Sequence, residues 1–240
     1  MIVEICASSF TSAYNAEQAG VHRIELCSEL AVGGITPSYG LIKQVSEALS
    51  IPFFVLIRPR SGDFTYSNEE FEIMKKDIKL CRELGCSGIV SGILNADFSI
   101  DVLRTQELVE LSKPLPFVFH RAFDWVPDTH KALNSLIDMG VHRVLTSGQE
   151  ATALKGLINL KKLQEQSNGG ITILPGGGIT LENALTFKDA GFKEIHCSLS
   201  TFNRTISSPN IPMNSKAHFD ETKIAMSDTD KIKALLRLLN

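Results

Sequence analysis

The sequence predicts an α/β protein, a (β/α)8 TIM barrel in a single domain. The first observation is a phrase that occurs four times: a helix end, a glycine, a short turn and an apolar strand. Glycine suits the end of a helix because that position favours a positive φ. The second is the spacing of roughly 50 to 65 residues, which fits two strand–helix units per interval. The third is the length of 240 residues, close to one barrel. The four copies are Ala19–Ile24, Leu84–Ile89, Met139–Val144 and Ala190–Ile195.

Eight apolar segments are predicted to form the strands. The even-numbered strands begin within the four repeated glycine phrases, and the odd-numbered strands lie in the gaps before or between these phrases. Two strands follow a proline, Pro52 or Pro116, which favours an extended start. In chain order the predicted strands are Ile2–Ala7, Arg23–Cys27, Phe53–Arg58, Gly88–Ile93, Phe117–Ala122, Arg143–Ser147, Ile171–Pro175 and Glu194–Leu199.

Segments with helical periodicity separate the strands, most clearly in Asn68–Leu84, Asp128–Met139 and Ala151–Gln166. We assign residues 1–200 to the barrel and 201–240 to a C-terminal extension. The extension begins with an irregular polar tail, Thr201–Pro212. It ends in a helix that starts at Ser227, with Asp230 three residues later as a loose capping box. This helix is expected to cover the barrel wall or to form a subunit contact.

Composition excludes several classes of protein. The net charge of −3 and a pI of about 6.1 do not suggest a nucleic-acid partner or an anionic membrane. The N-terminus lacks the basic region of a signal peptide, and no apolar run reaches the length of a membrane span. The five cysteines are odd in number and scattered, which favours reduced thiols in the cytoplasm.

Polar residues alternate with apolar ones along several strands, so they should face the barrel axis. If the apolar residues pack outward on helices, one pocket gathers two carboxylates, two thiols, arginines, histidines and small residues. The inward set is Glu4, Cys6, Glu25, Cys27, Arg58, Arg60, His120, Ala122, Asp124, His196 and Ser198. The alternative is a purely structural network in which Arg58 bridges Glu4 and Glu25. Such a network would explain only the charged residues of this inward set. Polar groups at the C-terminal rim are typical of a functional barrel.

Cys6 and Cys27 lie on adjacent predicted strands at similar levels. Opposed Cβ atoms on neighbouring strands are about 5 Å apart. Two thiolates at that spacing could hold Cu(I), a soft ion. The alternative is a pair of inert buried thiols that pack as small hydrophobic groups.

The turn after the seventh strand is rich in glycine and leads toward a helix. Gly176, Gly177 and Gly178 could present backbone N–H groups to an anion, as barrels often do after strands 7 and 8. Ser198, after the eighth strand, and Arg60 complete this predicted anion site. The alternative is a tight turn that merely requires glycine.

His120 is the strongest candidate for proton transfer, because an imidazole can titrate near neutrality. Asp124 could orient it. We predict a catalytic set of Glu25, Arg58, His120, Asp124 and His196, with Glu25 or His120 as base and His196 as acid or oxyanion donor.

Several blocks also resemble a known family. Cys27–Ile42, Ile57–Arg60 with Gly62–Phe64, Phe119–Asp124, Val144–Gln149 and Pro175–Ile179 closely resemble the signature of the CutC family, named for copper homeostasis. The similarity extends from Val3 to Ser198. Val32 departs from it, because the family usually carries glutamate there. The tail after Leu199 matches no part of the signature.

The resemblance implies a cytoplasmic TIM barrel, often dimeric, in which Cys6 and Cys27 occupy positions proposed to bind Cu(I). The first hypothesis is therefore a copper homeostasis protein of the CutC type that binds Cu(I) through these cysteines. The second is an isomerase or lyase acting on a small phosphorylated or anionic metabolite. No strand-end lysine is available for a Schiff base. The third is a binding module that has lost its chemistry.

Overall fold

The computed structural model describes residues 1–211, 213 and 220–240 and confirms the predicted TIM barrel. Eight parallel strands form one sheet in the order β7-β6-β5-β4-β3-β2-β1-β8. A bridge between Gly176 and His196 brings its two edges together. The strands are β1 Ile2–Ala7, β2 Arg23–Leu26, β3 Phe53–Leu56, β4 Gly88–Ser91, β5 Phe117–Phe119, β6 Arg143–Thr146, β7 Thr172–Pro175 and β8 Glu194–Cys197.

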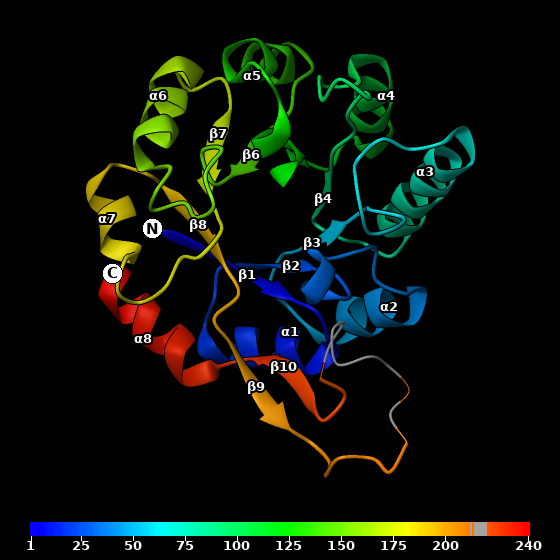
Figure 1. Cartoon of the computed structure of the whole chain (residues 1–240), viewed down its shortest axis with the longest axis vertical. Helices are drawn as coiled ribbons and strands as arrows, with labels where there is room; N and C mark the ends of the chain where they lie inside the picture. Colours follow the sequence, from blue (N-terminus) through cyan, green and yellow to red (C-terminus); the bar gives the residue numbers. More distant parts are fainter. Residues whose placement is uncertain (212, 214–219) are drawn as a thin grey trace.

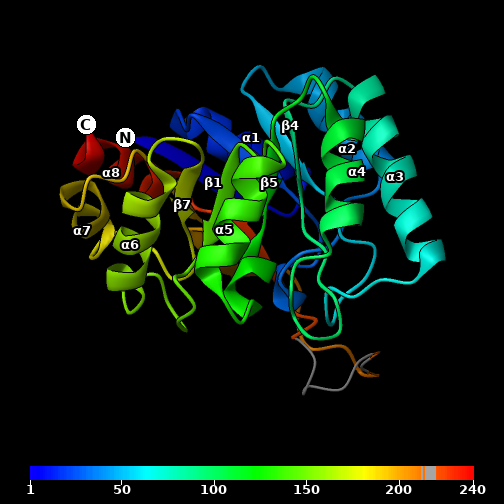
Figure 2. The ribbon, with the colours of Figure 1, turned by 90° about the horizontal axis from the view of Figure 1, so that it is seen from above.

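A ring of helices surrounds the strands, and Figure 2 shows helices α3, α4 and α5 running alongside them. All four repeated glycines have positive φ, with values of 85°, 75°, 75° and 85° for Gly20, Gly85, Gly140 and Gly191. The repeated phrase therefore ends a helix and redirects the chain into a strand, as predicted. The helices are α1 Phe10–Ala19, α2 Tyr39–Ala48, α3 Asn68–Glu83, α4 Val102–Ser112, α5 Thr129–Asp138, α6 Leu157–Ser167, α7 Ala184–Asp189 and α8 Thr229–Leu239.

Several predicted element boundaries are wrong, most of them because the observed strands end one or two residues earlier, and three differences have a clear local cause. Strand β5 ends at Phe119, because residues Arg121–Trp125 form a 3-10 helix in which the N–H of Ala122 donates to His120 Nδ1. Helix α6 begins at Leu157 rather than Ala151, after a close backbone crossing of Gly156 with Ser147. Helix α8 begins at Thr229, because Asp228 accepts hydrogen bonds from the N–H groups of the first turn.

The C-terminal residues are more regular than predicted. Strands β9 (Ser200–Arg204) and β10 (Lys223–Ser227) pair antiparallel and project from the ring (Figure 1). Helix α8 then lies between α7 and α1, so the predicted extension supplies the eighth helix of the ring. Ser12 Oγ accepts a hydrogen bond from the N–H of Ser227 at 3.1 Å and ties β10 to α1. Pro212, in the predicted polar tail, lies outside the described residues.

The core has an outer and an inner part. The outer part packs strand side chains against the helices, and α8 contributes Ile232, Leu235 and Leu239 to it. The inner part fills the barrel with Cys6, Cys27, Phe54, Leu56, Val90, Val118, Leu145 and Leu174. The predicted inward facing of the two cysteines is therefore correct.

Candidate functional site

An ionic layer closes the barrel at the N-terminal ends of its strands. We use this name for Glu4, Arg23, Arg143 and Glu194. Arg23 donates hydrogen bonds to Glu4 and, at 2.5 Å, to Glu194, which also accepts one from Arg143 at 3.0 Å. Both guanidinium groups lie 5.4 Å from the centre of the Phe54 ring. Buried charges require such mutual pairing, since each would otherwise be desolvated without compensation.

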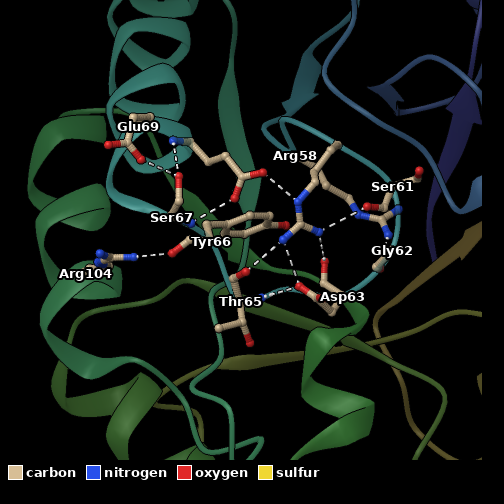
Figure 3. A network of polar contacts seen from close by, with 11 residues as sticks. Arg58, Ser61, Gly62, Asp63, Thr65, Tyr66, Ser67, Glu69 and Arg104 are labelled. Atoms are coloured by element: carbon tan, nitrogen blue, oxygen red, sulfur yellow. Dashed lines mark hydrogen bonds and ion pairs between the residues drawn. The ribbon is translucent and has the colours of Figure 1, made fainter.

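The structural alternative, in which Arg58 bridges Glu4 and Glu25, is wrong. Arg58 is buried, but it donates to the carbonyl groups of Val32, Gly34 and Gly62 at 2.7 to 2.8 Å and thereby fixes two loops. Figure 3 shows Arg58 beside Gly62. Its guanidinium lies 4.9 Å from the centre of the Phe64 ring. The sequence interpretation missed Arg23 and Glu194. Each lies two positions before a predicted inward residue on the same strand, Glu25 or His196, and so faces the same way.

A cavity of about 1070 Å³ opens at the C-terminal ends of the strands, above the inner core. Among the predicted site residues, its lining includes Cys6, Glu25, Arg58, His120, Gly177, Gly178, His196 and Ser198. These residues come from several strands or from the loops that follow them. The arrangement matches the place where barrels usually bind ligands.

Four predicted site residues do not line the cavity, and one of them, Cys27, is fully buried. Arg60 does not line the cavity. Its guanidinium forms ion pairs with Asp63 and Glu70. Nη2 of Arg60 also donates to the carbonyl of Thr65; Figure 3 labels Asp63 and Thr65. Gly176 uses its N–H group in a hydrogen bond to the carbonyl of Thr146. Asp124 does not line the cavity. The expected inward facing of Arg60 and Asp124 is wrong, because strand alternation stops where each strand ends.

Asp124 does not orient His120. Its carboxylate accepts hydrogen bonds from Arg121 Nε at 2.8 Å and from the N–H of Ser147 at 3.0 Å, and it also accepts from Thr146 and Gln149. His120 Nδ1 instead accepts a hydrogen bond from the N–H of Ala122 at 3.2 Å. Asp124 is therefore part of the support for Arg121.

His120 is held as a neutral imidazole. Burial, together with the charge of Arg58, lowers the pKa of His120 to about 3. Because Nδ1 accepts a hydrogen bond, the proton belongs on Nε2, which is buried and has no partner among the described residues. The ring occupies the space that a Cβ on Gly92 would fill, since that atom would lie 2.7 Å from it. His120 thus presents an unused N–H donor rather than a base.

Cys6 and Cys27 form a close thiol pair, with their Sγ atoms 3.5 Å apart. Cys27 is fully buried, whereas Cys6 reaches the cavity. The hydrogen bond with Cys27 and burial raise the pKa of the Cys6 thiol well above its usual value. In the absence of a metal, Cys6 is therefore a neutral thiol at pH 7.

His196 and Glu25 lie next to this pair. Ligand atoms of Cys6, Glu25 and His196 are all within 4.8 Å of one another. His196 Nδ1 lies 2.7 Å from Glu4 Oε1. Burial alone would lower the pKa of His196, but the carboxylates of Glu25 and Glu4 outweigh it and hold that pKa well above its usual value.

The two carboxyl groups beside His196 have opposite pKa shifts. Burial alone would raise the pKa of Glu4, but hydrogen bonding to His196 and the charge of Arg23 lower it to about 2. Burial raises the pKa of Glu25 to about 7, because the nearby charge of His196 offsets only part of that cost. Glu25 Oε2 has no hydrogen-bond partner among the described residues. One carboxyl group is thus fixed in an ion pair, and the other remains available to the cavity.

These donors fit a soft metal ion. With metal–sulfur bonds of about 2.3 Å, as in zinc thiolates, sulfur atoms 3.5 Å apart subtend roughly 100° at the ion. Such a bent arrangement leaves a third position, and His196 offers a ring nitrogen within 4.8 Å of Cys6 Sγ. Metal-binding histidines usually donate their other ring N–H to a carboxylate, which is the position of Glu4.

Fold and site together define a TIM-barrel protein with a polar cavity and paired thiols at its strand ends. The model of the CutC family matches residues 1–201. The copper homeostasis protein cutC homolog of Homo sapiens is 42% identical over 238 residues, covering 98% of this chain and 87% of that protein. A family protein CutC of Histophilus somni is 40% identical and covers 99% of both chains.

Solved structures agree with this assignment. A CutC structure from Streptococcus agalactiae has a TM-score of 0.78 and 37% identity, covering 82% of this chain and 97% of that one. The chain belongs to the CutC family. A thiamine phosphate pyrophosphorylase from Pyrococcus furiosus shares the fold alone, with a TM-score of 0.60 and 13% identity over 99% of this chain and 95% of that one. Among the described residues, no helix is both long and apolar enough to cross a bilayer.

Proposed function

We propose that this chain is a copper homeostasis protein that binds one Cu(I) through Cys6, Cys27 and His196. The observation that carries the proposal is the thiol pair, with sulfur atoms 3.5 Å apart and an imidazole beside it. Thiolate and imidazole are ligands that Cu(I) favours. The similarity to the copper homeostasis protein cutC homolog of Homo sapiens supports this assignment.

Burial determines how such a site would exchange metal. Cys27 is fully buried and Cys6 is 7% exposed, so an ion reaches the thiols only through the cavity. The thiol of Cys6 and the imidazole of His196 are both protonated at neutral pH, because each has a pKa held well above its usual value. Each must therefore release a proton when it binds Cu(I). We therefore expect tight storage with slow exchange rather than rapid transfer from an exposed loop.

An anaerobic competition titration with Cu(I) tests the proposal. The reduced parent protein should bind one ion, and the variant Cys6→Ser/Cys27→Ser should lose that binding. A matched control is Cys81→Ser/Cys86→Ser, which removes another buried pair of contacting cysteines beside α3. The control should bind Cu(I) like the parent. Unchanged binding by Cys6→Ser/Cys27→Ser would overturn the site.

A second candidate is an isomerase or lyase that acts on a small anionic metabolite. The unpartnered Nε2–H of His120 in the cavity favours it, since a preorganised donor can stabilise an oxyanion. Glu25, whose pKa burial raises to about 7, could serve as base. The role proposed for His120 is therefore oxyanion donor.

Deuterium exchange tests this second candidate. Small phosphorylated carbonyl compounds would be incubated with the protein in D2O, and loss of C–H signals would be followed by NMR. We expect exchange with the parent and its loss with His120→Phe, which retains a ring without the donor. Exchange by His120→Phe at the parental rate would contradict the role of His120.

We further propose that the protein forms a dimer. Phe202 on β9 is 71% exposed, so this projecting sheet carries an apolar side chain that a second copy could cover. Light scattering should give the mass of a dimer for the parent and of a monomer for Phe202→Ser. A monomeric parent would contradict the proposal.

A further inference from the structure

The turn after β7 has an unsatisfied set of backbone donors. Gly177 and Gly178 have φ values of 106° and 73°, which residues with a Cβ rarely adopt. The N–H groups of Gly177, Gly178 and Ile179 donate no hydrogen bond within the described part of the chain. Consecutive free N–H groups in such a turn can bind an anion.

Arg121 lies directly over this turn. A Cβ on Gly177 would be 3.3 Å from Arg121 Nη1, which is a tight contact, so the guanidinium packs closely against this glycine. Arg121 Nε donates to Asp124 at 2.8 Å, and Nη2 donates to Ser147 Oγ at 2.9 Å. Nη1 has no hydrogen-bond partner among the described residues, and Arg121 lines the cavity. The arginine is thus fixed by two contacts and keeps one donor group free.

His120 supplies an independent sign of a missing ligand. Its side chain is buried and lines the same cavity, yet its Nε2–H donor has no partner among the described residues. Leaving a buried donor unsatisfied costs about 1–3 kcal/mol. An oxygen atom of a ligand in the cavity would satisfy it.

The charges around the turn favour an anion. Lys231 from α8 lines the cavity, lies 3.8 Å from Asp228 and donates to Thr201 Oγ1 at 3.3 Å. Its side chain is 46% exposed, so it remains able to reach a ligand. The acidic residues in the lining are Glu182, which is exposed at the rim, and Glu25, which lies deep beside His196.

We propose that Arg121, the N–H groups of Gly177–Ile179 and Lys231 bind the phosphate group of a small organic phosphate, while His120 Nε2–H binds an oxygen of its organic part. The proposal rests on the second candidate function and identifies its substrate class. The cavity volume of about 1070 Å³ accommodates a ligand much larger than phosphate alone. The arginine of the anion site is therefore Arg121 instead of Arg60.

Inorganic phosphate is the probe for this site. Trp125, the only tryptophan in the sequence, lines the cavity, so its fluorescence should report binding. Phosphate would be titrated into the copper-free protein at constant ionic strength, with calorimetry as a second measurement. Loss of a charge-assisted donor in Arg121→Met should weaken binding about tenfold, and Lys231→Met should weaken it to a lesser extent.

The matched control is Lys233→Met, two positions along the same helix and outside the cavity lining. It should bind phosphate like the parent. Arg121→Met should also retain Cu(I) binding, which would show that its fold is intact. Absence of phosphate binding by the parent, or parental affinity in a folded Arg121→Met, would overturn the proposal.

The proposed copper site and the proposed phosphate site can be tested independently, because different variants should affect each ligand. Cys6→Ser/Cys27→Ser should lose Cu(I) and keep phosphate, whereas Arg121→Met should keep Cu(I) and bind phosphate about tenfold more weakly. Absence of exchange in D2O despite phosphate binding would reject the enzyme function but leave the anion site. Acetate binding as tight as phosphate binding would overturn the assignment to a phosphate group.

Discussion

His196 Nδ1 lies 2.7 Å from Glu4 Oε1, and this contact joins the ionic layer to the cavity. Glu4 faces Arg23 below and His196 above, so a single carboxylate neutralises charge on two strands. The same contact fixes the imidazole ring beside Cys6. The stability of the barrel base and the geometry of the proposed copper site therefore depend on one side chain.

Replacing this carboxylate should be costly. We expect Glu4→Gln to lower the free energy of unfolding by about 3 kcal/mol, because Arg23 would keep its charge in a buried site with one partner fewer. Chemical denaturation measures the change. Glu47→Gln is the control, since its ion pair with Lys43 is exposed to solvent and should contribute little to stability. Equal losses in both variants would contradict this account.

Removal of the proposed third ligand should weaken copper binding. His196→Gln should lower the affinity for Cu(I) at least about tenfold, because the two sulfur atoms would retain a bent geometry with one ligand fewer. The anaerobic competition titration measures it. His22→Gln provides the comparison, since His22 lies outside the cavity lining and accepts a hydrogen bond from Val3. If His196→Gln bound Cu(I) as tightly as the parent, His196 would not be a ligand, and the site would consist of the two cysteines alone.

Acid should destabilise the protein through His120. Its pKa is lowered to about 3 in the folded state and is about 6.5 when unfolded, so the unfolded chain binds more protons between these values. Stability should rise with pH in this window and fall by up to about 1.4 kcal/mol per unit below pH 6.5. Unfolding measured at pH 5 and pH 7 should show a smaller difference for His120→Gln. An unchanged difference would mean that His120 titrates normally.

Two glycines should respond oppositely to alanine. A Cβ on Gly88 would lie 2.1 Å from the Phe54 ring inside the barrel, so Gly88→Ala should destabilise by about 3 kcal/mol. Gly40 is in α2, and a Cβ added there would meet no atom within 4 Å, so Gly40→Ala should stabilise by up to about 1 kcal/mol. Thermal unfolding of both variants measures the contrast. A stable Gly88→Ala would show that Phe54 can move aside.

Strand alternation and the repeated glycines were sufficient to predict the barrel and the inward facing of Cys6, Cys27 and Glu25. The same alternation also places Arg23 and Glu194 on the inward face of their strands, although neither was among the predicted site residues. Alternation fails after Phe119, where the chain turns into a 3-10 helix and sends Asp124 toward Ser147. It could not predict that Arg121 would contact the cavity.

Other features depend on contacts between distant segments. Lys231 reaches the cavity only because α8 completes the ring beside α1, and no local pattern encodes that position. The pairing of β9 with β10 likewise joins residues on either side of a long connection. One alternative from the sequence was that Arg58 would neutralise Glu4 and Glu25. Its donors are instead satisfied by backbone carbonyl groups of loops that the fold brings together.

The ionic layer and the Phe54 ring close the barrel beneath the thiols. An ion at Cys6 must therefore arrive and leave through the same mouth that Arg121 and Lys231 line. A molecule bound at that mouth would slow uptake and release by the same factor if it did not contact the ion. Its effect would then appear in exchange rates, while the dissociation constant for the metal stayed unchanged.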